Sequence, residues 1–307
     1  MFFVLLLYAL FASVFTIGKT SLEYAQPLFL VGTRMFVAGV LILLYQCMTN
    51  RQAFRMNSVQ LWKIARLAIF NIYLTNVFEF WGLKYLTSFK TCFIYSLSPF
   101  VSALLSYIVF SEKLSWKKWL GLAIGFAGFI PILFNETSTE EQTGHLLSLS
   151  WAEISVMLAA ICSVYGWILL QQLVRDEKCN PFMANGCSML VGGVCAIGHS
   201  YLVEPWNPIP VTNLFSFLEC TLLLIVISNL ICYNLYGALL KKHSATFMSF
   251  AGFTTPLFAA FFGWLYLGEV VSWPFYLSAF IVFFGLLMFY QEELQREYVT
   301  TPTIANN

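Results

Sequence analysis

Apolar segments of about 20 residues recur along the whole chain, separated by short polar or Pro/Gly-containing breaks. A helix of that length crosses the hydrocarbon core of a bilayer, which is about 30 Å thick. The segments are continuous and do not alternate with a period of two residues, so the pattern predicts helices and not the strands of a barrel. The predicted spans lie near residues 2–20, 27–48, 61–82, 88–110, 117–134, 151–173, 181–203, 213–236, 245–267 and 273–291. The expected fold is an all-α membrane protein with ten transmembrane helices.

The longest polar break covers residues 135–150 and divides the chain almost in half. It contains Glu136, Glu140 and Glu141, and we interpret it as a linker between two five-helix units. The units are residues 1–134 and 151–291, and residues 292–307 are expected to form a cytoplasmic tail.

Composition supports the membrane assignment. The 307 residues are 59% hydrophobic and 10% charged, with a mean hydropathy of +0.76, whereas soluble domains carry about 25% charged residues. The net charge of +1 and the lack of a basic cluster interleaved with aromatic residues argue against a nucleic-acid partner. The eight cysteines contain no C-x-x-C pair, so we expect no disulfide, metal site or cofactor.

The Lys and Arg residues outside the spans predict the orientation, because cytoplasmic loops keep the positive charge. With a cytoplasmic N-terminus, twelve of the sixteen lie on the cytoplasmic side and three on the other, namely Lys19, Lys84 and Lys90. The sixteenth, Arg34, lies inside a span. We therefore expect a multi-pass protein of the inner cell membrane with both termini in the cytoplasm.

The two units are internally similar. A shift of 157 residues pairs Pro99 with Pro256, Ala103 with Ala260, Glu112 with Glu269, and Ser115-Trp116 with Ser272-Trp273. A shift of 154 residues pairs Pro27 with Pro181, Gly32 with Gly186, Met35 with Met189, and Gly39 with Gly193. Five spans is an odd number, so the second copy must enter the membrane from the opposite side. Inverted repeats of this kind are typical of carriers whose substrate site lies near the midplane.

These positions resemble the drug/metabolite transporter superfamily, specifically its EamA-like ten-helix members. The resemblance covers both units and is clearest at Ser98-Pro99-Phe100, residues 112–116, residues 121–128, Thr255-Pro256-Leu257, residues 268–273 and Gly285. It implies a central cavity formed by spans 1–4 and 6–9, with spans 5 and 10 outside. Members of the superfamily carry amino acids, nucleotide sugars, purines or drugs, so the resemblance does not select a substrate.

Some members take up S-adenosylmethionine, sometimes by exchange with S-adenosylhomocysteine, and the chain is similar to them in general character. The expected function is therefore secondary-active transport of a small polar metabolite by alternating access, as a monomer or homodimer. Export of an amino acid or drug coupled to protons is the alternative. An enzyme is not expected, because His145, His199 and His243 are widely separated and no other clustered catalytic set occurs.

Charged side chains inside spans are costly and often mark substrate pathways. Arg34 lies midway along the second span, where the second copy has Ser188, and its guanidinium suits a substrate carboxylate. A salt bridge to Glu79 is the alternative. Helical spacing places Thr75, Asn76 and Glu79 on one face, where Glu79 could bind a substrate cation or a proton, or join an interhelical hydrogen-bond network.

Other candidates lie at span ends or carry rings. Lys90 is expected to snorkel to the interface or, alternatively, to contact an anionic group. Rings beside acids can hold an adenine by stacking and a sulfonium by cation–π attraction. The complete expected substrate-binding set is Arg34, Asn76, Glu79, Lys90, Tyr95, Tyr165, Trp167, Asn229 and Tyr233.

Four residues are expected to act in gating or as scaffold. Pro99 and Pro256 remove backbone hydrogen bonds within spans, so bending there could accompany gating. Glu112 and Glu269 recur at the ends of spans 4 and 9, where they are expected to support helix starts and packing and not to bind a ligand.

Overall fold

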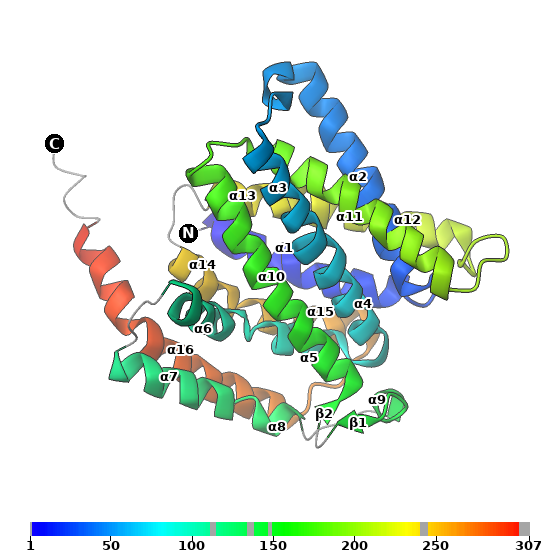
Figure 1. The fold of residues 1–307 in the computed structure, drawn as a ribbon. Coiled ribbons are helices and arrows are strands. Elements are labelled where there is room, and N and C mark those ends of the chain that lie inside the picture. The colour runs from blue at the N-terminus through cyan, green and yellow to red at the C-terminus, as the bar shows by residue number, and fades with distance from the viewer. Residues whose placement is uncertain (1, 111–114, 134–137, 147–148, 240–244, 301–307) are drawn as a thin grey trace.

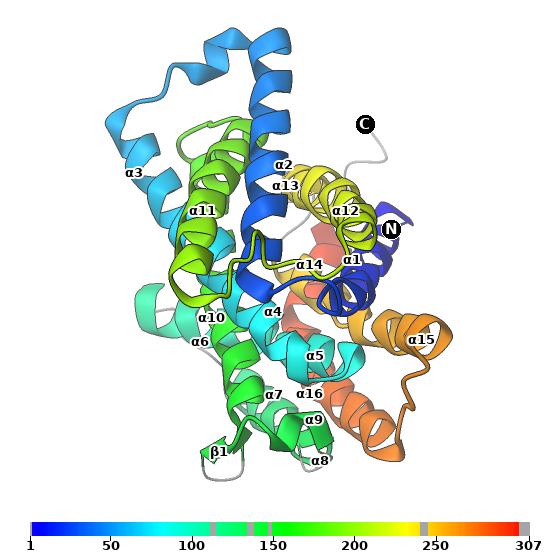
Figure 2. The ribbon, with the colours of Figure 1, turned by 90° about the vertical axis from the view of Figure 1, so that its right-hand side faces the viewer.

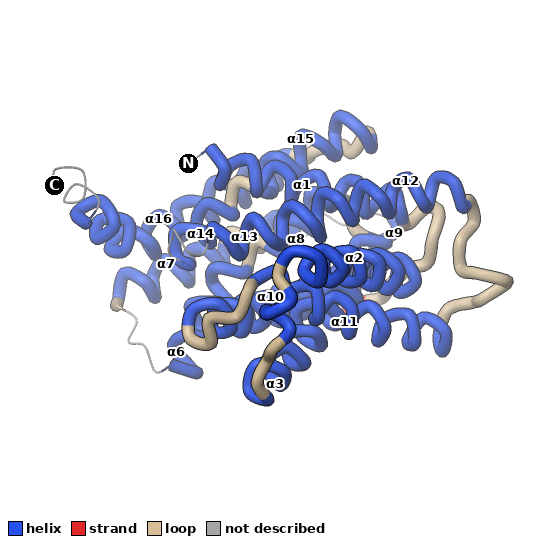
Figure 3. Tube along the Cα trace, turned by 90° about the horizontal axis from the view of Figure 1, so that it is seen from above, coloured by secondary structure: helices blue, strands red, loops and turns tan. Residues whose placement is uncertain are grey.

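The computed structural model describes residues 2–110, 115–133, 138–146, 149–239 and 245–300, which fold almost entirely into helices (Figure 1). The first half contains α1 (Phe2–Ser21), α2 (Pro27–Thr49), the 3-10 helix η1 (Arg51–Phe54), α3 (Ser58–Leu67), the π-helix η2 (Ala68–Leu74), α4 (Thr75–Tyr85), α5 (Ser88–Tyr95), α6 (Ser98–Phe110), α7 (Trp116–Ala127) and α8 (Ile130–Leu133). The second half contains α10 (Trp151–Arg175), α11 (Pro181–Val203), α12 (Leu214–Leu224), the π-helix η3 (Ile225–Cys232), α13 (Tyr233–Leu239), α14 (Ala245–Gly252), α15 (Thr255–Leu267) and α16 (Trp273–Thr300). Between them lie α9 (Ser138–Glu141) and the antiparallel strands β1 (His145–Leu146) and β2 (Leu149–Ser150). Figure 3 shows how short most of the connecting loops are.

Nine helical stretches within the described residues are long and apolar enough to cross a bilayer. The chain is therefore a multi-pass, all-α membrane protein, as its hydropathy predicts. The predicted third span, near residues 61–82, is not among the nine. Its residues lie in an unbroken helical succession of α3, η2 and α4, but polar side chains such as Asn71, Asn76 and Glu79 lower its hydropathy. The tenth span stays a prediction.

The last predicted span, near residues 273–291, matches the apolar stretch Trp273–Gln291, but its helix is longer. Helix α16 continues to Thr300 and so includes residues 292–300 of the expected tail. The added residues include Glu, Gln, Leu and Arg, which favour helices even where no apolar core holds them.

Helices α2 and α11 lie side by side with their backbones in close approach (Figure 2). A Cβ atom added to Gly39 would lie 2.5 Å from the Leu190 nitrogen, and one added to Gly193 would lie 2.5 Å from the Phe36 nitrogen. Small residues permit this kind of helix contact in membranes, where packing replaces the hydrophobic driving force. The crossing joins the two halves of the chain.

We expect Gly193→Ala to destabilise the folded protein by about 1–3 kcal/mol, because the new methyl group must displace backbone atoms of α2. Gly198→Ala is the matched control on the same helix, since a Cβ there meets nothing within 4 Å. That control should change stability by no more than about 1 kcal/mol, in the stabilising direction. Thermal unfolding of both variants in detergent measures the difference, and equal midpoints would contradict the close crossing.

Helices α7 and α16 form a second glycine-mediated pair, along the lower edge of the fold in Figure 1. A Cβ on Gly121 would lie 2.7 Å from the Gly285 carbonyl oxygen, and one on Gly285 would lie 2.6 Å from the Gly125 nitrogen. The pair corresponds to predicted spans 5 and 10. Among the described side chains of these two helices, none lines the cavity described below.

The prolines coincide with interruptions of two helices. Helix α5 ends at Tyr95 and α6 begins at Ser98, with Pro99 in its first turn. Helix α14 ends at Gly252 and α15 begins at Thr255, with Pro256 in its first turn. Proline has no N–H and fits only the first turn of a helix, so each span restarts there. The gating role of these breaks stays a prediction.

Candidate binding cavity

A cavity of about 190 Å³ lies between helices of both halves. Its wall includes residues from α1, α2, α4, α5 and α6 of the first half and from α10, η3, α13, α14 and α15 of the second. Of the predicted site residues, it brings together Arg34, Asn76, Glu79, Tyr95, Trp167 and Tyr233, and Pro99 also lines it.

Arg34 is held at this wall by specific contacts. Its side chain is 1% exposed, and its Nη2 donates to Asn76 Oδ1 at 2.5 Å. The guanidinium carbon lies 4.3 Å from the centroid of the Phe80 ring, a cation–π contact. Asn76 is fixed in turn because its Nδ2 donates to the Ile72 carbonyl at 2.8 Å. Among the described residues, Arg34 Nε and Nη1 have no hydrogen-bond partner, so the group retains donors for a ligand.

Glu79 lies one helical turn after Asn76 and is 8% exposed. It interacts electrostatically with Arg34, but within the described residues no ion pair of 4.0 Å or less joins them. The alternative of a direct Arg34–Glu79 salt bridge is therefore wrong for this structure. Thr75 does not face the cavity as the spacing predicted, because its hydroxyl donates to the Phe70 carbonyl at 2.8 Å within the preceding π-helix.

Aromatic rings form the wall that the second half contributes. The Trp167 ring centroid lies 4.4 Å from that of Tyr236 and 5.4 Å from that of Tyr233. Tyr233 also interacts electrostatically with Arg34, and both line this cavity. On the other half, Tyr95 packs edge-on against Phe15 at 6.1 Å. The cavity therefore combines one cation, one carboxylate and several rings.

The family resemblance implied that span 1 contributes to the cavity, but the sequence analysis named none of its residues as binding residues. Tyr8, Phe11 and Phe15 all line the cavity, and the Tyr8 hydroxyl donates to the Met248 carbonyl at 2.5 Å. Their spacing of three and four residues marks one helical face, and this signal was available in the sequence. It was hidden because rings are abundant on every span.

Two π-helices flank the cavity and were not predicted. Both η2 and η3 precede a cavity-lining segment, and the 157-residue shift carries Ala68 onto Ile225. The wider turns free backbone carbonyls that asparagine side chains then bind: Asn76 Nδ2 donates to Ile72, and Asn234 Nδ2 donates to Leu230 at 2.9 Å. Such turns occur frequently at functional sites.

Two predicted binding residues do not line the cavity. The Tyr165 ring packs against Phe70 at 4.9 Å and lies under the Arg66 guanidinium at 5.4 Å. Asn229 is fully buried, and its Nδ2 donates to the Met35 sulfur at 2.9 Å. The spacing argument placed Asn229 on the face of Tyr233, but the π-helix between them changes the angle per residue.

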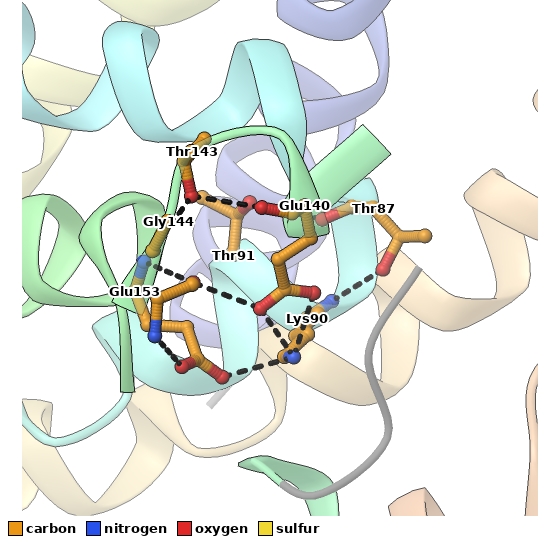
Figure 4. A network of polar contacts seen from close by, with 8 residues as sticks. Thr87, Lys90, Thr91, Glu140, Thr143, Gly144 and Glu153 are labelled. Carbon is orange, nitrogen blue, oxygen red and sulfur yellow. Dashed lines mark hydrogen bonds and ion pairs between the residues drawn. The ribbon is translucent and has the colours of Figure 1, made fainter. Parts of the chain in front are cut away.

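Lys90 also lies outside the cavity, in the buried network of Figure 4. It is 2% exposed, so the expectation that it snorkels to the interface is wrong. Its Nζ lies 2.8 Å from Glu140 Oε1 and 2.9 Å from Glu153 Oε1, and Ser150 Oγ donates to Glu140 at 2.9 Å. The anionic groups that Lys90 contacts are thus carboxylates of the linker and of α10.

Glu269 binds the beginning of a helix in the other half. Its Oε1 accepts from the Ser88 backbone N–H at 2.7 Å and its Oε2 accepts from the Ser88 hydroxyl at 2.6 Å, at the N-terminus of α5. A carboxylate is favourable there because the first N–H groups of a helix are unpaired. Glu112 lies outside the described residues.

Comparisons with known proteins place the chain in a family. A model of the EamA-like transporter family matches residues 1–134 and 150–291. An S-adenosylmethionine/S-adenosylhomocysteine transporter of Chlamydia muridarum is 38% identical over 94% of this chain and 91% of its own. A protein of the same name from Chlamydia trachomatis serovar L2 is 38% identical over 95% of this chain and 89% of its own.

A solved crystal structure aligns over 94% of this chain and 93% of its own, with a TM-score of 0.65 and 14% identity, which shows a shared fold. The relatives named above are transporters and not enzymes, in line with the sequence analysis. The nine apolar helices, the shared fold and the two matched stretches agree with one another. This chain is a transporter of the EamA-like family.

Proposed function

We propose that the chain carries S-adenosylmethionine into the cell in exchange for S-adenosylhomocysteine. The observation that carries this proposal is the 38% identity, over more than nine-tenths of the chain, to chlamydial transporters named for these two compounds. Both compounds carry an amino-acid head and an adenosine. The cavity supports this assignment, because it combines a buried guanidinium, a carboxylate and aromatic rings.

The proposed carrier has ten spans arranged as two inverted units, residues 1–134 and 151–291, in the inner cell membrane with both termini cytoplasmic. The equivalent positions of the two π-helices and of the two proline breaks support the repeat. The α2–α11 crossing also supports the repeat. Gly32 and Gly186 make equivalent contacts across it, and so do Gly39 and Gly193. In inverted-repeat carriers, rocking of one unit against the other opens a central site to each side in turn.

The test is uptake of radiolabelled S-adenosylmethionine into cells that express the chain and do not import the compound themselves. We expect saturable uptake that unlabelled S-adenosylhomocysteine inhibits and that free amino acids do not. In proteoliposomes, S-adenosylhomocysteine loaded inside should accelerate entry of the label, which is the signature of exchange. Uptake no higher than in cells with an empty vector would overturn the proposal and redirect the search to proton-coupled export.

A further inference from the structure

The cavity has too few charged groups for every charge of the proposed substrate. Among the described residues that line it, Arg34 and Glu79 carry the charges. S-adenosylmethionine carries three: a carboxylate, an ammonium and a sulfonium. S-adenosylhomocysteine has the first two and lacks the third. These two residues can pair with the carboxylate and the ammonium that both compounds share. The sulfonium is then left without an ionic partner among the described residues of the cavity.

We propose that the sulfonium binds against the ring wall of Trp167, Tyr233 and Tyr236, while Arg34 and Glu79 hold the amino-acid head. This inference rests on the proposed function and assigns its substrate groups to particular residues. The ring wall would then distinguish the two exchanged compounds, and the charged pair would bind both of them.

The position of the charged pair supports the first half of this assignment. Arg34 and Glu79 interact electrostatically without direct ion pairing, so each retains capacity for a ligand of opposite charge. The carboxylate and ammonium of an amino acid are bonded to the same carbon atom and need two such partners close together. The unpaired Nε and Nη1 of Arg34 supply donors for the carboxylate.

The position of the rings supports the second half. A sulfonium follows the amino-acid carbon after two methylene groups, so it must bind close to the head. Tyr233 and Arg34 line the same cavity, and the Tyr233 ring is 5.4 Å from that of Trp167, which in turn is 4.4 Å from that of Tyr236. The negative faces of aromatic rings attract a cation that has lost its water. With Glu79 engaged by the ammonium, these ring faces supply negative potential near the sulfonium.

Two substitutions test the assignment through the ratio of two affinities measured on one protein sample. Purified wild type and Trp167→Leu would bind tritiated S-adenosylmethionine, with unlabelled S-adenosylmethionine or S-adenosylhomocysteine as competitor. We expect Trp167→Leu to lower the preference for the sulfonium compound roughly tenfold, the size of a desolvated cation–π contact. Trp167→Phe keeps a ring and should retain most of the preference.

The ratio separates the inference from its alternatives. An equal loss of both affinities in Trp167→Leu would overturn the proposal, since it would mean that the ring holds the adenine or only shapes the cavity. Absence of binding by the wild type would refute the proposed function instead. If Trp167→Leu does not fold, Tyr236→Leu provides the same comparison. Trp264→Leu is the matched control, because Trp264 is 61% exposed and does not line the cavity, and its ratio should equal that of the wild type.

Discussion

Replacing Arg34 with alanine should abolish uptake of S-adenosylmethionine while the protein still inserts into the membrane. The guanidinium is buried and hydrogen-bonded, and the substrate carboxylate is its proposed charge partner. Removing one member of a buried, hydrogen-bonded charge pair costs about 2–5 kcal/mol, or at least roughly 30-fold in affinity. Lysine keeps the charge but not the planar fork, so Arg34→Lys should recover only part of the uptake. Initial uptake rates, divided by the amount of protein in the membrane, measure the effect.

A control variant and a double variant show whether the loss of uptake arises from the anchor role of Arg34. Arg51→Ala is the matched control, because Arg51 is the exposed first residue of η1. This variant should transport normally. The double variant Arg34→Ala/Glu79→Gln tests whether the loss arises only from a carboxylate left without its countercharge. Recovery of uptake in that variant, or normal uptake in Arg34→Ala itself, would contradict an anchor role for Arg34.

Replacing Lys90 with methionine should strongly destabilise the folded protein. The ammonium lies between Glu140 and Glu153, and both carboxylates are fully buried. Without Lys90 the two carboxylates would lose the ammonium that lies between them, and breaking a buried ion pair in this way costs about 3–5 kcal/mol. The measurement is the unfolding midpoint of the purified variant in detergent.

The chain offers a matched control for Lys90 in a second lysine–glutamate pair. Lys63 lies 2.7 Å from Glu177, but these side chains are 20% and 24% exposed. Partly exposed pairs contribute about 0–1 kcal/mol, so Lys63→Met should shift the midpoint much less. Adding Glu140→Gln and Glu153→Gln to Lys90→Met should restore part of the lost stability. Equal shifts for the two lysines would show that the buried network does not stabilise the fold.

Local sequence rules predicted most of the helices and the most polar part of the cavity. Pro99 and Pro256 act through their own backbone, so their effect could be foreseen without knowing the neighbours. Arg34 and Glu79 stand out because a charge within an apolar span must be compensated by other parts of the fold. In both cases the residue can be recognised from the sequence of its own span.

Other features depend on distant partners and could not be predicted. The partner of Lys90, Glu140, lies 50 residues away in a polar segment that looked like a simple linker. The wider turns of the π-helices η2 and η3 free backbone carbonyls that asparagine side chains bind, and the apolar periodicity of the sequence does not predict such turns. The π-helix η3 also accounts for Asn229, which lies within it and packs against Met35.

The α2–α11 crossing also determines how movement in this carrier can be measured. Backbones that meet at Gly39 and Gly193 have no layer of side chains between them that could rearrange. Sliding of one helix along the other would force backbone atoms to overlap, so the distance between them should stay constant through a transport cycle. Spectroscopic labels on this pair would supply a fixed internal reference. The displacement of the interrupted helices, α5–α6 and α14–α15, could then be measured against it.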